Sequence, residues 1–374
     1  MNVVEILDRL IAFPSVVGTP NHEIAGWIRE YAEQHGATVT VLPGPEGDRV
    51  NLFATLGPAD VPGYILSGHM DVVPPNDPTN SRDLFRMQRV GTRLYGRGAS
   101  DMKGYLAAML ACLDSLRGKT LKQPLHLAFS YDEEAGCRGA PHMISRLPEL
   151  CARPLGAIIG EPSGLQAICA HKGKAAVRLT VRGRTGHSSR PDQGLNAIHA
   201  LTEVLGTAVQ TARSLTAGPL DPVFEPPYST LQVGTVRGGQ SVNIIPDLCT
   251  ADLEARAIAG VVPLEILEPI RQHLTRLPEQ GYEVDWTVLS NYPSMSLPQE
   301  SDLARLMVEL TGLPPLAAVS YGTEAGLFQA AGIDAIICGP GDIAHTHKPD
   351  EFIETAELEA CQQMLERLTA RLVA

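Results

Sequence analysis

The chain has 374 residues, of which 44% are hydrophobic, and this length and composition suit a globular protein of two domains. Its 42 acidic and 30 basic residues give a net charge of −12, which argues against a nucleic-acid backbone or an anionic membrane surface as the main partner. We therefore expect no nucleic-acid partner and no membrane partner.

The N-terminus and the cysteines favour a cytoplasmic location. Residues 1–16 carry Glu5 and Asp8 where a secretory signal would carry positive charge, and no apolar run approaches the roughly 18 residues of a membrane helix. The seven cysteines are odd in number and form no Cys-x-x-Cys pair, so neither a disulfide framework nor a thiolate zinc site is indicated. A reducing compartment fits this pattern.

The predicted elements of the first half alternate between helices and strands. Helical periodicity predicts helices over 3–13, 22–36 and 104–118. Strands are predicted over 38–42, 50–57, 63–68, 125–132 and 155–161, with a turn-rich loop over 74–83. Near the C-terminus, another strand over 333–339 precedes a helix from about 355. Several of these runs are apolar throughout, which is typical of parallel strands buried on both faces.

The middle of the chain has a different pattern. Residues 175–183 alternate between apolar and charged residues, as a strand with one solvent-facing side does. The elements that follow are a helix over 194–209, strands over 229–239 and 249–257, a helix over 264–277 and a strand over 282–289. This β-α-β-β-α-β order is that of a ferredoxin-like unit. We therefore expect a discontinuous α/β domain with a mixed or parallel sheet (1–173 and 289–374), interrupted by an α+β domain (174–288).

Polar side chains follow several of the predicted buried strands. They are His69 and Asp71 after the strand over 63–68, Glu133 and Glu134 after 125–132, Glu161 at the end of 155–161, and His345 and His347 after 333–339, with Asp101 at the start of a helix. Each alone has an ordinary explanation, such as a hydrogen-bonded histidine, a solvated turn or a helix cap. Because ligands of open parallel sheets bind at the carboxyl ends of the strands, their shared location favours one functional site.

The residue types at this predicted site indicate metal ions. A cluster of carboxylates repels itself unless cations neutralise it. Two imidazoles and three carboxylates without a thiolate suit Zn²⁺, Co²⁺ or Mn²⁺. The number of acids suggests two metals that share one bridging carboxylate, with one further acid left for proton transfer.

The motifs around these residues resemble those of the M20 family of dinuclear metallohydrolases. They occur in order over nearly the whole chain as HMDVVP, YGRGASDMKG, SYDEEAGCRGA, GEPSG, HKGKAAVRLTVRGRTGHSSRPDQGLNAI and GPGDIAHTHKPDEF. The segments AHKGK, RTGHSS, YGTEA and AHTHKPDE look most like those of the acetylornithine deacetylase branch. Succinyl-diaminopimelate desuccinylases are the nearest relatives of that branch in pattern. Family aminopeptidases tend to carry Asp where this chain has Glu161.

The resemblance implies removal of an N-acetyl group from a small-molecule amino acid, with N2-acetyl-L-ornithine of arginine biosynthesis as the leading substrate. A desuccinylase, a general N-acyl-amino-acid hydrolase and an inactive binding protein of the same fold are the alternatives. The cofactors implied are two divalent metal ions, with Zn²⁺ ahead of Co²⁺ or Mn²⁺.

The resemblance also implies a role for each residue of the site. His69 and Glu161 would bind one metal, Glu134 and His347 the other, and Asp101 would bridge them. Glu133 would be the general base, and the Asp71 carboxylate would accept the second N–H of His69. His345 is left as a neighbour of the site, and the peptide bond between Asp101 and Met102 is expected to be cis.

Further candidates lie outside the metal ligands. By resemblance, His187 would donate to the oxyanion from the partner subunit of a homodimer formed through the 174–288 domain. Asn243 and Arg256 would hold the substrate, although Arg256 could also be a surface charge. The loop over 319–326 would border the substrate through Gly322, Thr323 and Glu324, with Glu324 facing the substrate ammonium. The alternative for that loop is that Thr323 caps a helix and Glu324 lies in its first turn.

Overall fold

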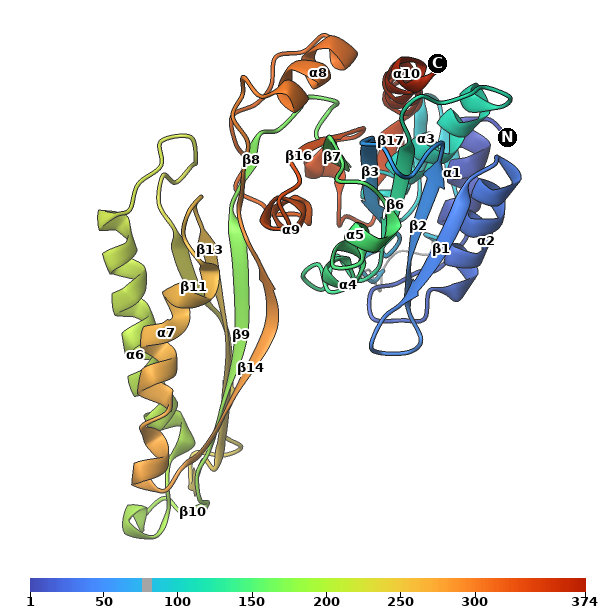
Figure 1. The fold of residues 1–374 in the computed structure, drawn as a ribbon. Coiled ribbons are helices and arrows are strands. Elements are labelled where there is room, and N and C mark those ends of the chain that lie inside the picture. Colours follow the sequence, from blue (N-terminus) through green and yellow to red (C-terminus); the bar gives the residue numbers. More distant parts are fainter. Residues whose placement is uncertain (76–82) are drawn as a thin grey trace. The chain divides into compact units, whose positions relative to one another are not determined.

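The structure, a computed structural model, describes residues 1–75 and 83–374, so most of the loop predicted over 74–83 lies outside the described residues. The chain divides into two compact units (Figure 1). Unit 1 comprises Met1–Ala170, Met295–Ala318 and Thr323–Ala374, and unit 2 comprises His171–Ser294 and Val319–Gly322.

Unit 1 contains a mixed sheet in which the strands follow the order β1-β2-β6-β3-β7-β16. Their bounds are β1 Thr38–Pro43, β2 Val50–Leu56, β3 Tyr64–His69, β6 Leu125–Ser130, β7 Gly156–Pro162 and β16 Ala335–Gly339. Strands β6, β3, β7 and β16 are parallel to one another, whereas β2 is antiparallel to both of its neighbours. The parallel strands are almost wholly buried, which explains their continuous apolar runs. Their carboxyl ends therefore lie along one edge of the sheet.

Helices cover both faces of this sheet (Figure 1). Helices α1, α2, α3 and α10 form one layer, α10 also packs against α8, and α4 and α9 lie on the opposite face with α5 after α4. Their bounds are α1 Val3–Ile11, α2 His22–Gln34, α3 Lys103–Ala111, α4 Ala140–Ile144, α5 Leu147–Leu150, α8 Asp302–Thr311, α9 Ala325–Ala330 and α10 Thr355–Leu372. Every residue of α3 is buried, and the helix tightens into a 3₁₀ turn over Cys112–Leu116, so it ends earlier than predicted.

Two sets of short strands complete unit 1 and its connection to the rest of the chain. Strands β17 (Phe352–Glu354), β5 (Arg93–Tyr95) and β4 (Gln88–Val90) form a small antiparallel sheet. Strand β8 (Ala170–His171) pairs with β15 (Met295–Ser296).

Unit 2 has the predicted β-α-β-β-α-β order and an antiparallel sheet in the order β11-β13-β9-β14. The bounds are β9 Gly173–Arg182, α6 Ala197–Ser214, β11 Thr230–Gly238, β13 Leu248–Ala257, α7 Pro263–Leu274 and β14 Glu283–Tyr292, with β10 Gly186–His187 paired to β12 Ile244–Ile245. Alternate residues of β9 and β13 are buried with α6 and α7 in a separate hydrophobic core. The other face of the sheet carries charged and polar side chains, as the alternation in 175–183 predicted. In the described part of the chain, no helix has the length and apolar character required to cross a membrane.

Candidate metal centre

The carboxyl edge of the unit 1 sheet brings the predicted metal ligands together. Strand β3 ends at His69, Glu161 lies in β7, and Glu134 follows β6. His347 follows β16, and Asp101 precedes α3. Because β3, β6, β7 and β16 are parallel, the side chains at their carboxyl ends meet at one edge, as the sequence predicted, and Asp101 at the start of α3 lies beside them.

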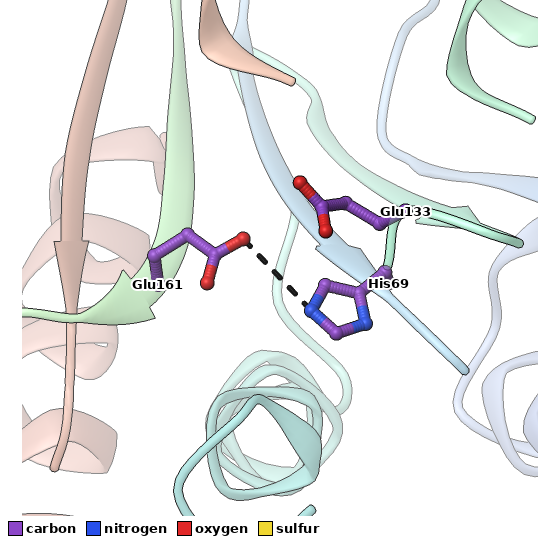
Figure 2. Close-up of side chains that lie close together, drawn as sticks. All are labelled: His69, Glu133 and Glu161. Carbon is purple, nitrogen blue, oxygen red and sulfur yellow. Dashed lines mark ion pairs between the residues drawn. The ribbon is translucent and has the colours of Figure 1, made fainter. Parts of the chain in front are cut away.

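Asp101 lies between the two histidines. Its Oδ1 is 3.1 Å from His69 Nε2, and its Oδ2 is 3.2 Å from His347 Nε2. Each imidazole also has a glutamate beside it: Glu161 Oε1 is 3.8 Å from His69 Nε2 (Figure 2), and Glu134 Oε1 is 3.1 Å from His347 Nε2. This arrangement matches two ligand pairs that share one carboxylate.

Glu133 belongs to the same cluster. Ligand atoms of His69, Glu133 and Glu161 lie within 4.8 Å of one another, as do those of His69, Asp101 and Glu134. Figure 2 shows the Glu133 carboxylate turned toward the space beside His69 and Glu161. The position of Glu133 therefore suits a metal ligand as well as a general base, and a measurement of metal content distinguishes the two roles.

The partner of His69 differs in detail from the expectation. Its Nδ1 is 2.9 Å from the backbone oxygen of Asp71 and 3.6 Å from the Asp71 carboxylate. The carboxylate instead accepts the backbone N–H groups of Glu133 and Glu134, each at 3.1 Å. The backbone carbonyl of Asp71 thus orients His69. Its side chain holds the loop that carries Glu133 and Glu134.

The electrostatics of the cluster call for cations. Burial raises the pKa of Glu133 to about 8 and that of Asp71 to about 7, with the Glu134 charge acting in the same direction on both. Burial and the charge of Asp101 raise the pKa of Glu161 as well. Hydrogen bonds to Asp101 and Glu134 raise the pKa of the His347 imidazole to about 10. Bound cations would favour the ionised form of these carboxylates, and two imidazoles with several carboxylates suit divalent zinc, cobalt or manganese ions.

The structure adds two residues that the sequence interpretation missed. Glu351 Oε1 accepts the backbone N–H groups of Ser100 and Asp101 at 3.0 and 3.1 Å, and its Oε2 pairs with Arg97 Nη1 at 2.7 Å. Arg97 Nη1 also donates to the carbonyl of Lys348 at 3.1 Å. The pair therefore holds the loop of Asp101 next to the loop of His347. The predicted cis peptide bond between Asp101 and Met102 is confirmed.

His345 lies in a 3₁₀ turn over Ile343–His345 and contacts the start of β17. Its ring lies 4.3 Å from the ring of Phe352, measured between centroids, and the two rings are tilted by 33°. This contact involves no residue of the metal site, so the role of His345 as a neighbour of the site stays a prediction.

The candidates of unit 2 fall into two places within that unit. His187 in β10 is exposed and accepts from Ser189, and Asn243 precedes β12, the partner strand of β10, with its carbonyl accepting from Ser188 N at 3.1 Å. Arg256 lies at the other end of the sheet, where its Nε is 2.7 Å from Glu254 Oε1. Arg256 is thus part of an ion pair on the polar face of the sheet.

In the loop over 319–326, the position of Glu324 differs from the expectation. Glu324 is 1% exposed, and its two carboxylate oxygens accept from Ser67 Oγ at 2.5 Å and Ser130 Oγ at 2.7 Å. A carboxylate enclosed in this way does not fit the role of facing a substrate ammonium. Thr323 Oγ1 accepts from Ala325 N at 3.1 Å, which fits the alternative of a cap on α9. A Cβ on Gly322 would lie 2.5 Å from the carbonyl oxygen of Lys172, so close packing explains this glycine.

Comparison with known proteins agrees with the geometry. A family profile described as peptidase family M20/M25/M40 matches residues 65–371. The chain is 31% identical to an acetylornithine deacetylase of Photorhabdus laumondii, with 98% of this chain and 96% of that protein covered. It is 32% identical to an acetylornithine deacetylase of Myxococcus xanthus, with 97% and 96% covered.

Solved structures share the fold at lower identity. An M20 family metallo-carboxypeptidase of Sulfolobus solfataricus has a TM-score of 0.81 at 19% identity, with 98% of each chain covered. A dinuclear metal-binding peptidase of the M20 family from Bacillus subtilis has a TM-score of 0.66 at 16% identity, with 99% of this chain and 97% of that chain covered. The chain therefore belongs to peptidase family M20/M25/M40 and is a metal-dependent hydrolase.

Proposed function

We propose that the protein removes the acetyl group from N2-acetyl-L-ornithine, giving L-ornithine and acetate, with two divalent metal ions as cofactors. The observation that carries the proposal is the convergence of two histidines and three carboxylates, with Glu133 beside His69 and Glu161, at one edge of the sheet. The near full-length similarity to proteins named acetylornithine deacetylase supports this substrate over other N-acyl amino acids. The reaction would serve arginine biosynthesis.

The metal ligands divide naturally into two sets. His69 and Glu161 would hold one ion, Glu134 and His347 the other, and Asp101 would be shared. Zn²⁺ is our first choice because its preference for mixed nitrogen and oxygen ligands matches the set. Bound at this site, the ions would polarise the acyl carbonyl and acidify a water molecule.

Glu133 would carry the proton through the reaction. Its carboxylate takes one proton from the attacking water and returns it to the amine nitrogen as the C–N bond breaks, so acetate and a free amino acid leave. Burial acts to raise the pKa of Glu133, so its carboxylate is a stronger base than that of an exposed glutamate. Cys137 lies beside it, with Sγ donating to Glu133 Oε1 at 3.3 Å, and limits the directions the carboxylate can take.

The arrangement inside unit 2 supports our proposal of a homodimer. Along β9, the sheet pairs Lys174 with Arg256 near one end and Arg182 with Leu248 at the other, and His187 lies beyond that second end (Figure 1). Eight residues of strand span roughly 25 Å, which is much longer than an N-acyl amino acid. If His187 and Arg256 both serve one substrate, they must come from different subunits. We therefore place His187, as an oxyanion donor, at the site of a second copy, together with its neighbour Asn243.

Arg256 would bind the substrate α-carboxylate. Its guanidinium is held by Glu254 at 2.7 Å and lies 3.4 Å from the Tyr292 hydroxyl, so its planar fork is oriented before a substrate arrives.

The cysteines of the chain are all free, which is consistent with the reducing cytoplasm that we propose as the location of the protein.

The experiment that tests this function is a substrate panel with metal-free protein reconstituted with Zn²⁺ or Co²⁺. N-acetylornithine, N-acetylmethionine and N-succinyl-diaminopimelate are compared by kcat/KM, with released acetate or succinate quantified. We expect N-acetylornithine to have the highest kcat/KM. A higher value for the succinyl substrate would replace the proposed reaction with desuccinylation. Metal binding without turnover of any N-acyl compound would favour a binding protein of the same fold.

A further inference from the structure

Glu324 is a buried carboxylate that the proposed chemistry does not use. It immediately precedes α9, it is 1% exposed, and both of its oxygens are occupied by serine hydroxyls. The two O···O distances, 2.5 and 2.7 Å, are those of short hydrogen bonds. Because a polar group is costly to remove from water, a carboxyl group in this place needs a purpose other than solubility.

The two serines belong to neighbouring strands that lead into the metal centre. Ser67 lies in β3, two residues before His69, and Ser130 is the last residue of β6, three residues before Glu133. β3 and β6 are parallel neighbours, and their register places His69 opposite Ser130. Both serines are fully buried. The Glu324 carboxylate therefore links the two strands at the end where each delivers a residue of the site.

Stabilisation of α9 does not account for this carboxylate. The side chain of Thr323 already accepts from Ala325 N at 3.1 Å, and the Glu324 side chain makes no capping bond to this helix. The hydrogen bonds of the carboxylate with Ser67 and Ser130 both connect the start of α9 to the sheet. The link is thus between the sheet and the segment that returns from unit 2 at Gly322.

We infer that Glu324 is a positioning residue for the metal centre. By holding the ends of β3 and β6, it fixes the separation of His69 from the loop of Glu133 and Glu134. Ligands of two ions must be placed to within about half an ångström, so a loosened strand pair weakens metal binding before it unfolds the domain. This inference rests on the proposed function only in assuming that the cluster binds metal. It does not depend on which acyl substrate is hydrolysed.

The test is a titration of Co²⁺ into metal-free protein, followed by calorimetry and by the visible absorption spectrum of the bound ion. Glu324→Gln keeps the shape of the side chain but replaces one acceptor oxygen by an N–H donor. We expect it to lower Co²⁺ affinity by at least about tenfold, the effect typical of partners that orient metal ligands, and to change the spectrum. Ser130→Ala removes one of the two donors and should change both readouts in the same direction.

Glu357→Gln is the matched control, because in the same unit the Glu357 carboxylate accepts from the backbone N–H of Glu354 at the start of α10. It should leave both Co²⁺ affinity and spectrum as in wild type. Should Glu324→Gln not fold, the result with Ser130→Ala decides. Wild-type affinity and spectrum in the folded variant would overturn the inference, even if stability fell. Failure of wild type to bind Co²⁺ would overturn it together with the metal centre, whereas metal binding without hydrolysis would overturn only the proposed function.

Discussion

Replacing Glu351 tests whether the buried pair with Arg97 holds the metal loops together. Both side chains are about 2% exposed, and the Glu351 carboxylate receives Arg97 at 2.7 Å in addition to two backbone N–H groups of the loop that carries Asp101. In Glu351→Gln, the amide oxygen can still accept the backbone groups. The Arg97 guanidinium, however, stays buried without its counter-charge.

The expected cost follows from that unpaired charge. Removing one partner of a buried ion pair destabilises a protein by about 3–5 kcal/mol, because the remaining charge stays out of water. We expect Glu351→Gln to lose about this much free energy of unfolding, measured by urea denaturation of metal-free protein so that bound ions add nothing. Arg97→Met together with Glu351→Gln should be more stable than Glu351→Gln alone, because the orphaned charge is gone.

A matched control lies three residues away. Glu354 pairs with Arg93 at 2.8 Å in the same kind of contact, but that pair is exposed, and Glu354→Gln should unfold close to wild type. The reasoning is refuted if Glu351→Gln loses no more stability than this control, or if adding Arg97→Met fails to restore any.

Two further predictions concern pH and assembly. Burial lowers the pKa of His126 from 6.5 to about 4, so the neutral ring contributes stability that is complete above pH 6.5 and is lost, by up to about 3 kcal/mol, as pH falls toward 4. Urea denaturation should show wild type losing more stability than His126→Gln over that range; parallel curves would contradict this. Mixed His187→Ala and Glu133→Gln subunits should recover activity that neither variant has alone, because one site of the hybrid is complete. Confirmed hybrids without activity would exclude a role for His187 in the partner's site.

The sequence predicts the fold best along the buried parallel strands and at the residues that follow them. The apolar runs that became β3, β6, β7 and β16 could be identified because strands buried on both faces contain few polar residues. The polar residues that end such runs then marked the site. The sequence does not predict short strands such as β4 and β5, because three residues are too few to show a periodic pattern of apolar side chains.

The supporting contacts could not be predicted in the same way. Arg97 and Glu351 are 254 residues apart, and Ser67 and Glu324 are 257 apart. No local spacing links such residues, so the sequence of the loop alone predicts that Glu324 faces the substrate. Its actual partners follow from the packing of α9 against the sheet, which is a property of the folded chain.

The most direct test of the metal centre is the metal content of Glu133→Gln, determined by emission spectroscopy beside its kcat for N-acetylornithine. If Glu133 is the base and the other residues are the ligands, the variant should retain two equivalents of Zn²⁺, the same content that we expect of wild type. Its kcat should fall by about 10²–10⁴-fold, the usual contribution of a general base. Loss of metal in parallel with activity would contradict the account, since Glu133 would then be a ligand.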